Sequence, residues 1–596
     1  MKSLRLNAAL GLLVFLLMLP FAAPAQAKTA TSVPTKTMAT DPAAINLAHL
    51  DALGQDVTIG GKQMLIIHIY SEYPDYKWVD AAGEGIACVD DTARAAIVYL
   101  NDYQQTHNQQ SLEKAKKALT FVMHMQASDG EFYNFIKSDF SINTDGPTSK
   151  KSFDWWAARA MWALGDGYSV LKDTDPAFAG TVKTSFLLAN TALQRKINSQ
   201  YGEYTSLHGY RVPAWIGGFD AMSNALLGLT DFYRSQPLDA VKDSMLKLGR
   251  GLSEYQFGSF TQYPFGAHLD WDGSPTLWHA YGSGQSFALA NAGVLLNQKD
   301  WVRSAKQEMD QFFSHLLVTG MINQMGPTPD KNGQIAYGVN MLTQGFMAVY
   351  HATHEQKYAQ YAGLAASWLT GNNDAHFAMY DPANGRGYDG LDGTTGKVNL
   401  NSGAESTIEA LMALQAVHQS AAALNTVNAK AVERHTTSIY EAEAFTVSAG
   451  HPQIITPASN WTGDALYSGQ IVQMSNNDQL KQEINVAHQE KYILSAALVK
   501  PHTLSGAITL KIGIDGHAVS TVQVPRSPDS DYLTLMGLGG PLSLSRGKHT
   551  LTVTLQTVAN QSLVLDNIVL QPAKEYAVFK QPNGSLFTLA RNLLKD

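Results

Sequence analysis

Cysteine is almost absent from this 596-residue chain: Cys88 stands alone, so no intramolecular disulfide can form and a disulfide-stapled scaffold is excluded. Charge is also sparse, because Asp, Glu, Lys and Arg make up 16% of the residues, below the ~25% of an average soluble protein. The 43 basic residues are outnumbered by 51 acidic ones, which argues against a nucleic-acid binder, since that class needs a basic face. After residue 27, no run reaches the ~18 to 20 apolar residues that a membrane span requires.

The first 27 residues have the pattern of an export signal. Lys2 and Arg5 form a positive start, residues 10–21 are apolar, and residues 25–27 (Ala-Gln-Ala) have the small-x-small form of a cleavage site. The alternative is an uncleaved membrane anchor. Cleavage would leave 41 basic against 51 acidic residues, and we expect a bacterial protein that is secreted, extracellular or cell-wall associated, with no stable membrane span.

The length predicts two or three folding units, since domains usually run to ~100 to 250 residues. A Thr/Ala/Pro-rich linker at 28–40 precedes residues 41–436, which are dominated by helical periodicity. Residues 437–573 alternate instead with period two, and we leave 574–596 as a C-terminal tail without assigned structure. The expected strands are 479–486, 491–499, 507–514, 549–558 and 562–571. The predicted fold is thus an all-α domain followed by an all-β jelly-roll sandwich.

The helical segments form pairs at a spacing of about 60 residues, which is typical of repeated helical hairpins. The expected helices begin near residues 90, 111, 152, 175, 214, 238, 280, 300, 335, 354, 403 and 421. Six such hairpins, none able to bury its apolar stripe alone, predict a closed (α/α)6 toroid. The long connections between pairs then emerge on one face, where we expect the functional site.

Aromatic rings recur in these long connections, next to amide, imidazole and carboxylate side chains. Such rings suit the apolar faces of pyranose sugars, while the polar groups can bond hydroxyls. The alternative is that many of the rings pack at the rim. The candidate rings for binding a polysaccharide or oligosaccharide are Tyr133, Trp278, Tyr281 and Tyr388.

Carboxylates decide whether the site does chemistry, since hydrolysis of a glycosidic bond generally needs one protonated and one ionised carboxyl group. Asp90 and Asp91 open the first hairpin, where we expect one of them to cap the helix and the other to face the ring. Glu405 lies in the first turn of the sixth hairpin, which neighbours the first in a closed ring. We expect these three residues to converge as the catalytic group.

Further polar residues on the same connections are candidates for contacts with substrate. They are Glu84, Asp129, Glu131, Asp154, Asp220, His268, His279, Asp389 and Asn401. For Asp389, in a Gly-rich loop, a turn-forming role is the competing interpretation.

Several of these segments resemble a bacterial group of six-hairpin toroid proteins that is described as glycosidase-like. The likeness is collinear over residues 60–420 and includes Val-Asp-Asp-Thr-Ala-Arg at 89–94, Asp-Gly-Glu-Phe-Tyr-Asn at 129–134 and Asn-Ser-Gly-Ala-Glu-Ser-Thr at 401–407. The broader toroid superfamily holds many inverting glycoside hydrolases, some lyases and epimerases. The resemblance implies Asp91 or Asp90 as general base and Glu405 as general acid.

The C-terminal part resembles carbohydrate-binding module families 6 and 35. The resemblance rests on Tyr-Glu-Ala-Glu at 440–443 and Leu-Asp-Asn-Ile at 565–568. It implies that Glu441, Glu443 and Asp566 help to hold a structural calcium ion. Members often have a sugar-binding Asn two residues before the last Asp, where this chain has Val564. A sandwich that serves only as a spacer is the alternative.

The sequence therefore favours an exported inverting glycoside hydrolase that needs no cofactor for catalysis and binds no nucleic acid. A polysaccharide lyase or an epimerase acting on uronic acids is a second interpretation. It would need a proton acceptor such as Tyr281, His279 or His268, and a cation such as Arg211 for the substrate carboxylate. The third is a non-catalytic glycan-binding protein of the cell surface.

Overall fold

The computed structural model describes residues 41–558 and 560–594, and residues from Pro42 onward cluster as one compact unit. The predicted signal and linker, 1–27 and 28–40, lie outside the described residues. No helix in the described ranges has the length and apolar character needed to cross a membrane.

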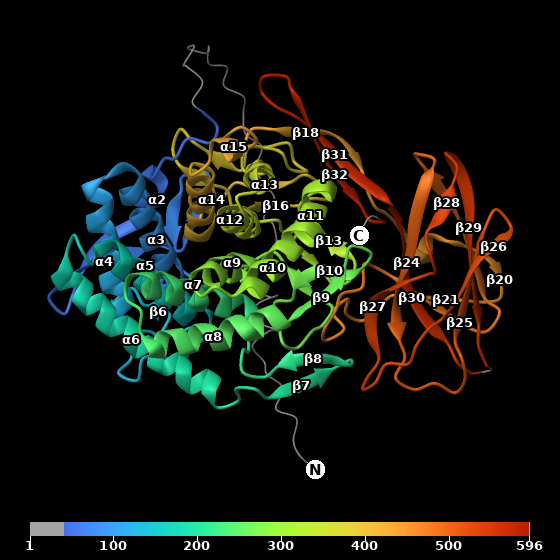
Figure 1. The fold of residues 1–596 in the computed structure, drawn as a ribbon, viewed down its shortest axis with the longest axis horizontal. Helices are drawn as coiled ribbons and strands as arrows, with labels where there is room; N and C mark the ends of the chain where they lie inside the picture. The colour runs from blue at the N-terminus through green and yellow to red at the C-terminus, as the bar shows by residue number, and fades with distance from the viewer. Residues whose placement is uncertain (1–40, 559, 595–596) are drawn as a thin grey trace. The chain divides into compact units, whose positions relative to one another are not determined.

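Within the described residues, helical hairpins make up the part of the chain before the sheet domain (Figure 1), and the helices form six pairs. The first helices of the pairs are α3 (Val89–Thr106), α5 (Trp155–Leu171), α7 (Phe219–Ser235), α9 (Gln285–Leu295), α12 (Ala336–Thr353) and α14 (Ala404–Val417). Their partners are α4 (Gln109–His124), α6 (Pro176–Asn198), α8 (Asp239–Glu254), α10 (Lys299–Glu308), α13 (Gln356–Ala366) and α15 (Ala421–Leu424). Each first helix packs against the next, and α14 packs against α3, so the predicted toroid is a closed ring.

Small residues set the spacing of the inner ring. Gly165 of α5 and Gly228 of α7 lie so close that a Cβ atom at Gly165 would be 2.1 Å from the Gly228 carbonyl oxygen. Backbones can approach this closely only where a side chain is missing. The inner helices are therefore buried nearly all round, and the outer helices cover them.

One outer helix departs from regular α geometry. Helix α10 continues through a π-helix, η1 (Met309–Phe313), into α11 (Ser314–Thr319).

The long connections fold into small antiparallel sheets, where the sequence analysis placed loops. A short helix, α2 (Ala48–Leu53), precedes them. The paired strands are β1 (Gly54–Ile59) with β2 (Lys62–Ile67), β3 (Tyr70–Glu72) with β4 (Lys77–Val79), β5 (Ala87–Cys88) with β6 (Phe135–Ile136), β7 (Tyr204–Leu207) with β8 (Tyr210–Pro213), and β9 (Gln256–Ser259) with β10 (Gln262–His268). They continue with β11 (Trp278–His279), β12 (Gln324–Met325) and β13 (Pro329–Asp330) in one sheet, β14 (Tyr380–Asp381) with β15 (Arg386–Gly387), and β16 (Gly390–Leu391) with β17 (Val398–Asn399).

Two antiparallel sheets form the second part. One contains β21 (Gln453–Ile455), β22 (Ile471–Met474), β30 (Leu563–Pro572), β24 (Glu490–Lys500) and β27 (Tyr532–Gly537) in that order, with β19 (Ser438–Glu441) on β30 and β28 (Leu542–Leu544) on β24. The other has the order β20 (Thr446–Ala449), β23 (Gln479–Val486), β29 (Gly547–Gln556), β25 (Thr509–Ile514) and β26 (His517–Gln523). Alternating apolar side chains from both sheets fill one core. The jelly-roll connectivity stays a prediction.

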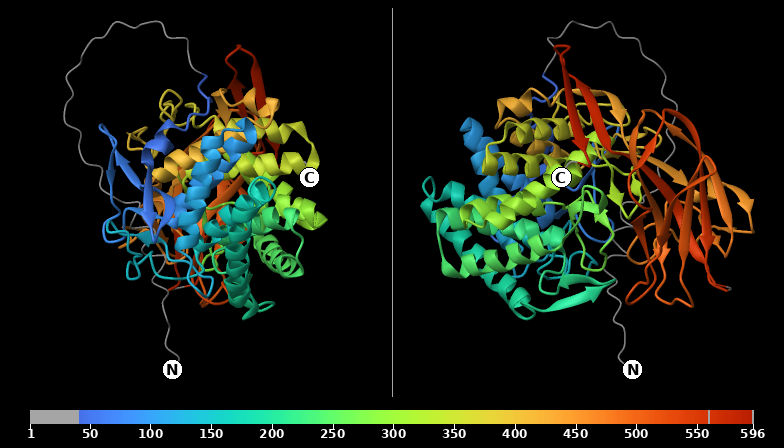
Figure 2. Two further views of the ribbon diagram at one scale, coloured as in Figure 1. Left: turned by 90° about the vertical axis from the view of Figure 1, so that its left-hand side faces the viewer. Right: turned by 45° about the vertical axis from the view of Figure 1, so that its right-hand side comes forward.

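The last described residues return to the helical domain. Strands β31 (Lys574–Lys580) and β32 (Leu586–Asn592) form a hairpin, red in Figure 2, that pairs with β18 (Lys430–His435) and packs on α11. Glu575 of β31 is fully buried, forms an ion pair with Arg591 of β32 and lies 3.1 Å from His315 Nδ1 of α11. The tail that was left without assigned structure thus forms a three-stranded sheet together with residues that precede position 437.

Candidate functional site

Arg94 gathers the carboxylates that the sequence analysis singled out. It is fully buried on α3, and its Nη2 lies 2.8 Å from Asp91 Oδ1 and 3.2 Å from Glu405 Oε2. Its Nη1 donates to Glu409, one turn further along α14. Because Asp91 and Glu405 bind the same nitrogen, their bonded oxygens are at most about 6 Å apart. Residues more than 300 positions apart in sequence therefore meet at one cation.

Local sequence positions the pair at the start of α3. Cys88 is the N-cap: the backbone N–H of Asp91 donates to Cys88 Sγ over 3.4 Å, and the thiol donates to Asp91 Oδ2 over 3.3 Å. The expectation that one of the two Asp residues caps this helix is therefore wrong. The thiol occupies that place, which leaves both carboxyl groups for the ring.

Asp90 binds a second buried guanidinium. Arg159 of α5 donates to Asp90 and also to the hydroxyl of Tyr337, at the start of α12. The carbon atoms of both guanidinium groups lie 5.0–5.1 Å from the centre of the Tyr337 ring. Burial alone would raise the pKa of Asp90, but the charges of Arg159 and Arg94 outweigh it and lower that pKa.

Asp91 and Glu405 differ sharply in environment. Burial raises the pKa of Asp91 to about 7, and the nearby Asp90 and Glu405 charges add to the effect, while Arg94 offsets it in part. The Asp91 side chain is 6% exposed, whereas that of Glu405 is 42% exposed and ion-paired with Arg94. A carboxyl group that is partly protonated at neutral pH thus adjoins one that is exposed to solvent.

The turn that carries Glu405 is held by Asp389. Its Oδ1 accepts from the Gly403 backbone N–H over 2.8 Å and from the Ser406 hydroxyl over 2.5 Å. Asn401 lies beside this turn and accepts from the Tyr73 backbone N–H over 3.0 Å. Asp389 therefore positions the start of α14, so the turn-forming interpretation of its role fits the contacts it makes.

A second polar cluster lies on the neighbouring hairpins. His279 Nε2 is 3.9 Å from Asp220 Oδ2, and Asp270 Oδ2 accepts from the His279 backbone N–H over 2.8 Å. The His279 ring stacks on Tyr281 with centroids 4.1 Å apart. Burial raises the pKa of Asp220 to about 6 and lowers that of His279, which leaves a neutral imidazole beside a mainly ionised carboxyl group at neutral pH.

The two clusters belong to one site. Both Asp220 and Glu405 contribute to the raised pKa of Tyr281, and the charge of Arg159 acts on Asp220 as well as on Asp90. Asp90, Asp91, Asp220 and Glu405 all lie in the first turns of inner helices. Since these helices run parallel in the ring, their N-terminal turns bring the side chains to the same face.

Sequence reasoning missed the residues that bind this cluster together. Arg94, Arg159, Tyr337 and Glu409 were not named as site residues, although each is buried at the centre of the ring. Glu409 also accepts from Asn340 Nδ2 over 2.6 Å. The available signal was a charged side chain within an otherwise apolar, Ala-rich helix, because such a charge is rarely buried without a partner.

Four of the predicted carboxylates form contacts within the long connections between hairpins and lie outside the Arg94 cluster. Glu84 is buried and accepts from the backbone N–H of Thr148 over 2.9 Å and from the hydroxyls of Thr148 and Ser149, so it fixes the loop that contains them. Lys151 pairs with Asp129 and lies 4.0 Å from Glu131, and Lys196 Nζ is 3.2 Å from Asp154 Oδ1. These contacts are structural.

Among the other predicted binders, His268 and Trp278 are core residues. His268 is fully buried between Glu308 and Ser304 of α10, at 2.9 Å and 2.8 Å, and Trp278 packs on Phe312. Tyr133 packs partly buried against the core. Tyr388 is half-buried, and its ring lies 5.7 Å from that of Phe377.

The three predicted calcium ligands lie around residues 468–470. The Ser468 hydroxyl lies 2.5 Å from Glu441 Oε2 and 3.2 Å from Asp566 Oδ2, and the Gln470 backbone N–H donates to Glu443 over 3.3 Å. Burial raises the pKa of Asp566 to about 7, and the Glu441 and Glu443 charges contribute. In the described part of the chain, no three or more His, Cys, Asp and Glu side chains are arranged as a metal centre.

No family model and no curated protein matches this chain. The chain is similar in structure to sugar epimerases and to carbohydrate-binding modules. A sugar epimerase from a ruminal bacterium is 14% identical, with a TM-score of 0.45 over 62% of this chain and 95% of its own. The cellobiose 2-epimerase of Spirochaeta thermophila is 12% identical, with a TM-score of 0.44 over 63% and 94%. A CBM36 module solved with calcium and xylotriose is 13% identical over 22% and 97%, with a TM-score of 0.17. Identities this low carry nothing about activity.

Proposed function

We propose that this protein is a carbohydrate-active enzyme, most specifically a glycoside hydrolase that uses Asp91 and Glu405. The observation that carries the proposal is the pair itself: the Asp91 and Glu405 oxygens bonded to Arg94 are at most about 6 Å apart, burial raises the pKa of Asp91 to about 7, and Glu405 is exposed to solvent. Two adjacent carboxyl groups whose environments separate their titration are the recurring arrangement for acid–base division of labour.

The electrostatics reverse the roles implied by the family resemblance. Asp91 is the group that retains a proton near neutral pH, so it donates to the leaving oxygen, while the solvent-exposed Glu405 is the nucleophile that attacks the anomeric carbon. The upper limit of about 6 Å applies to the two oxygens bonded to Arg94, and it is compatible with the ~5 to 5.5 Å of retaining enzymes. We therefore propose retention in place of the inverting course expected from sequence, with the anomeric form of the product as its test.

The electrostatic coupling between Asp91 and Glu405 suits both steps of a retaining reaction, the formation of the glycosyl ester and its hydrolysis. When Glu405 forms the glycosyl ester, its negative charge disappears, and with it one of the charges that raise the pKa of Asp91. The pKa of Asp91 then falls, so this group, which has given up its proton, can accept one from water as the water releases the sugar from Glu405. Asp91 is then protonated again.

The test is incubation of the purified chain with a panel of bacterial and plant polysaccharides, with products analysed by mass and anomeric form. Glu405→Gln should abolish the release of reducing ends and leave glycan binding intact. The matched control is Glu131→Gln, which changes a carboxylate outside the site. Equal turnover by the Glu405 variant would remove this assignment, and products of inverted configuration would remove the retaining course.

A second candidate, epimerisation or elimination by proton abstraction, is supported by His279. This imidazole is buried and neutral, and its Nδ1 has no hydrogen-bond partner in the described part of the chain. Asp220 and Tyr281 adjoin it, so a proton could pass between ring and carboxyl group. Uptake of solvent deuterium at a sugar carbon, or absorbance from an unsaturated product, would favour this chemistry over hydrolysis.

For the sheet domain we propose a structural calcium ion at Glu441, Glu443 and Asp566. Oε2 of Glu443 and Oδ1 of Asn567 are buried without a partner among the described residues, and the three carboxylates repel one another. A hard cation with oxygen ligands would give the two unpartnered oxygens a ligand and would reduce the repulsion between the carboxylates.

We also propose that the chain is exported and acts on a polysaccharide or oligosaccharide outside the cell.

A further inference from the structure

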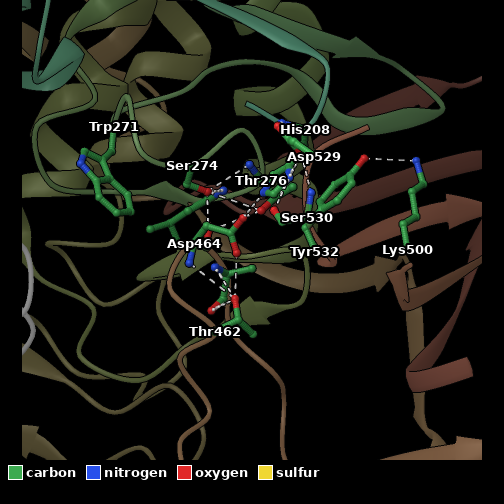
Figure 3. A network of polar contacts seen from close by, with 12 residues as sticks. His208, Trp271, Ser274, Thr276, Thr462, Asp464, Lys500, Asp529, Ser530 and Tyr532 are labelled. Carbon is green, nitrogen blue, oxygen red and sulfur yellow. Dashed lines mark hydrogen bonds and ion pairs between the residues drawn. The ribbon is translucent and has the colours of Figure 1, made fainter. Parts of the chain in front are cut away.

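His208 ties the helical domain to the sheet domain. It lies at the tip of the β7–β8 hairpin with φ +51°, in the left-handed region, and is buried (Figure 3). Its Nε2 is 2.5 Å from Asp464 Oδ2 and its Nδ1 is 2.9 Å from Asp529 Oδ1. The His208 backbone N–H also donates to Asp529 Oδ2 over 2.7 Å. Both carboxylates belong to loops of the sheet domain.

This geometry requires a charged ring. A neutral imidazole has one N–H donor, whereas both nitrogens donate in the imidazolium form. Carboxylates accept on both sides here, so only the protonated ring satisfies every contact. Figure 3 also shows the Tyr532 side chain, whose ring stacks on His208 with centroids 4.1 Å apart and planes 6° from parallel.

Asp464 connects this contact to the candidate site. Its backbone carbonyl accepts from the Ser274 hydroxyl, and Ser274 Oγ accepts from the backbone N–H groups of Thr276 and Leu277 over 3.1 Å and 2.9 Å. The same segment continues to His279. Trp271 of this segment also lies 6.1 Å, ring to ring, from Trp461 of the sheet domain. The loop that presents His279 is therefore braced by the residue that holds His208.

We propose that His208 is a protonation-dependent latch that holds the loop of residues 459–468 against residues 271–279 of the helical domain. The latch is a property of the domain interface and does not depend on which reaction the site performs. In the closed state, two charge-assisted hydrogen bonds join the domains, and these are the strong class of hydrogen bond. Loss of the ring proton removes one of them and leaves one of the two carboxylates facing a ring nitrogen that carries no proton.

The direction of the pH effect follows from the neighbouring charges. Burial opposes protonation, but the hydrogen bonds to Asp464 and Asp529 outweigh it and raise the pKa of His208. The Tyr532 hydroxyl accepts from Lys500 over 3.3 Å, and Tyr210 lies on the same hairpin as His208; both tyrosines have raised pKa values, so they stay neutral at neutral pH. Stability from the latch is complete below the ordinary histidine pKa of about 6.5 and is lost as the pH rises through the raised value.

Hydrogen exchange of the full chain, measured at several values between about pH 6 and about pH 9 and corrected for intrinsic rates, tests this proposal. We expect amide protection of residues 204–213 and 459–468 to fall by about tenfold or more across this range, the loss expected for one charge-assisted hydrogen bond. In His208→Asn, protection should be low throughout and independent of pH. The control is His517→Asn, an exposed histidine of β26 that should retain the full wild-type response.

Two results would overturn the latch: wild-type protection that is flat over the range, or the same pH response in His208→Asn. As a second measurement, Asp464→Asn should loosen residues 271–279 as well as 204–213, whereas Asp529→Asn should loosen 204–213 alone. Exchange requires no substrate, so a failure of the hydrolase proposal leaves this test intact. Equal loosening of 271–279 by both variants would refute the connection through Asp464.

Discussion

Replacement of Arg94 by Met tests whether one buried cation holds the site together. Arg94 forms ion pairs with Asp91, Glu405 and Glu409, and its side chain is 1% exposed. Met preserves much of the length and apolar volume, so the main loss is the charge. Removal of one partner from a buried ion pair typically costs about 3 to 5 kcal/mol, because the remaining charge is left uncompensated. We expect a loss of that size in the free energy of unfolding of the helical domain.

The loss should grow with pH. Arg94 lowers the pKa of Asp91, so its removal raises that pKa further above the ordinary value for Asp. A group whose pKa is raised in the folded state favours folding at low pH, and this contribution is lost as the pH rises through the folded value. Near pH 5 the variant can neutralise Asp91 by protonation, whereas near pH 8 it must bury the charge or unfold.

Denaturant unfolding followed by helical circular dichroism at both pH values measures the effect. The control is Arg303→Met, whose side chain is 73% exposed and pairs with Asp300, and which should leave stability within error. A loss below about 1 kcal/mol, or one that shrinks as the pH rises, would refute the view of Arg94 as the central counter-charge.

Three further predictions address the fold, the reaction and the sheet domain. Gly165→Ala should lower stability by about 1 to 3 kcal/mol through its clash with the Gly228 carbonyl, whereas Gly180→Ala, in open space on α6, should raise the melting temperature slightly. Hydrolysis should decline above about pH 7 as Asp91 loses its proton, and a pH profile that rises steadily through pH 8 would contradict its role as the acid. Millimolar calcium should raise the melting temperature of the sheet domain in the wild type but not in Glu443→Gln, and equal shifts in both would place the ion elsewhere.

Periodicity predicted the helices and strands well for a physical reason. Each inner helix must bury an apolar face in the ring, and each core strand must alternate apolar and polar side chains. The local sequence therefore shows the period of each element. All twelve expected helix starts lie within five residues of observed ones, and β23 begins and ends as expected. The hairpin β31–β32 has a local signal that was not used, an Asn-Gly turn at 583–584 between two strand segments. Only its pairing with β18, some 140 residues earlier, has no local pattern.

The candidate site was predicted in part. Closure of the ring is enough to bring Asp90, Asp91 and Glu405 together, since the sixth hairpin must adjoin the first. The sequence could not rank the other carboxylates, because Asp129, Asp154 and Asp220 all lie in similar polar segments. In the structure, Asp129 and Asp154 pair with lysines, whereas Asp220 lies next to His279. The sequence also does not distinguish His268 from His279, although His268 is a core residue and His279 adjoins Asp220.

The sequence by itself determined the division into a helical ring and a sheet domain, the hairpin count, and the carboxylates that meet at the N-terminal turns. Tertiary structure alone decided which carboxyl group keeps its proton, because this depends on burial and on the distance to Arg94. It also decided that Cys88 caps α3 and that His208 lies between two carboxylates. Apolar burial follows a local period along the chain, whereas charge pairing depends on atoms brought within a few ångströms by the closed fold.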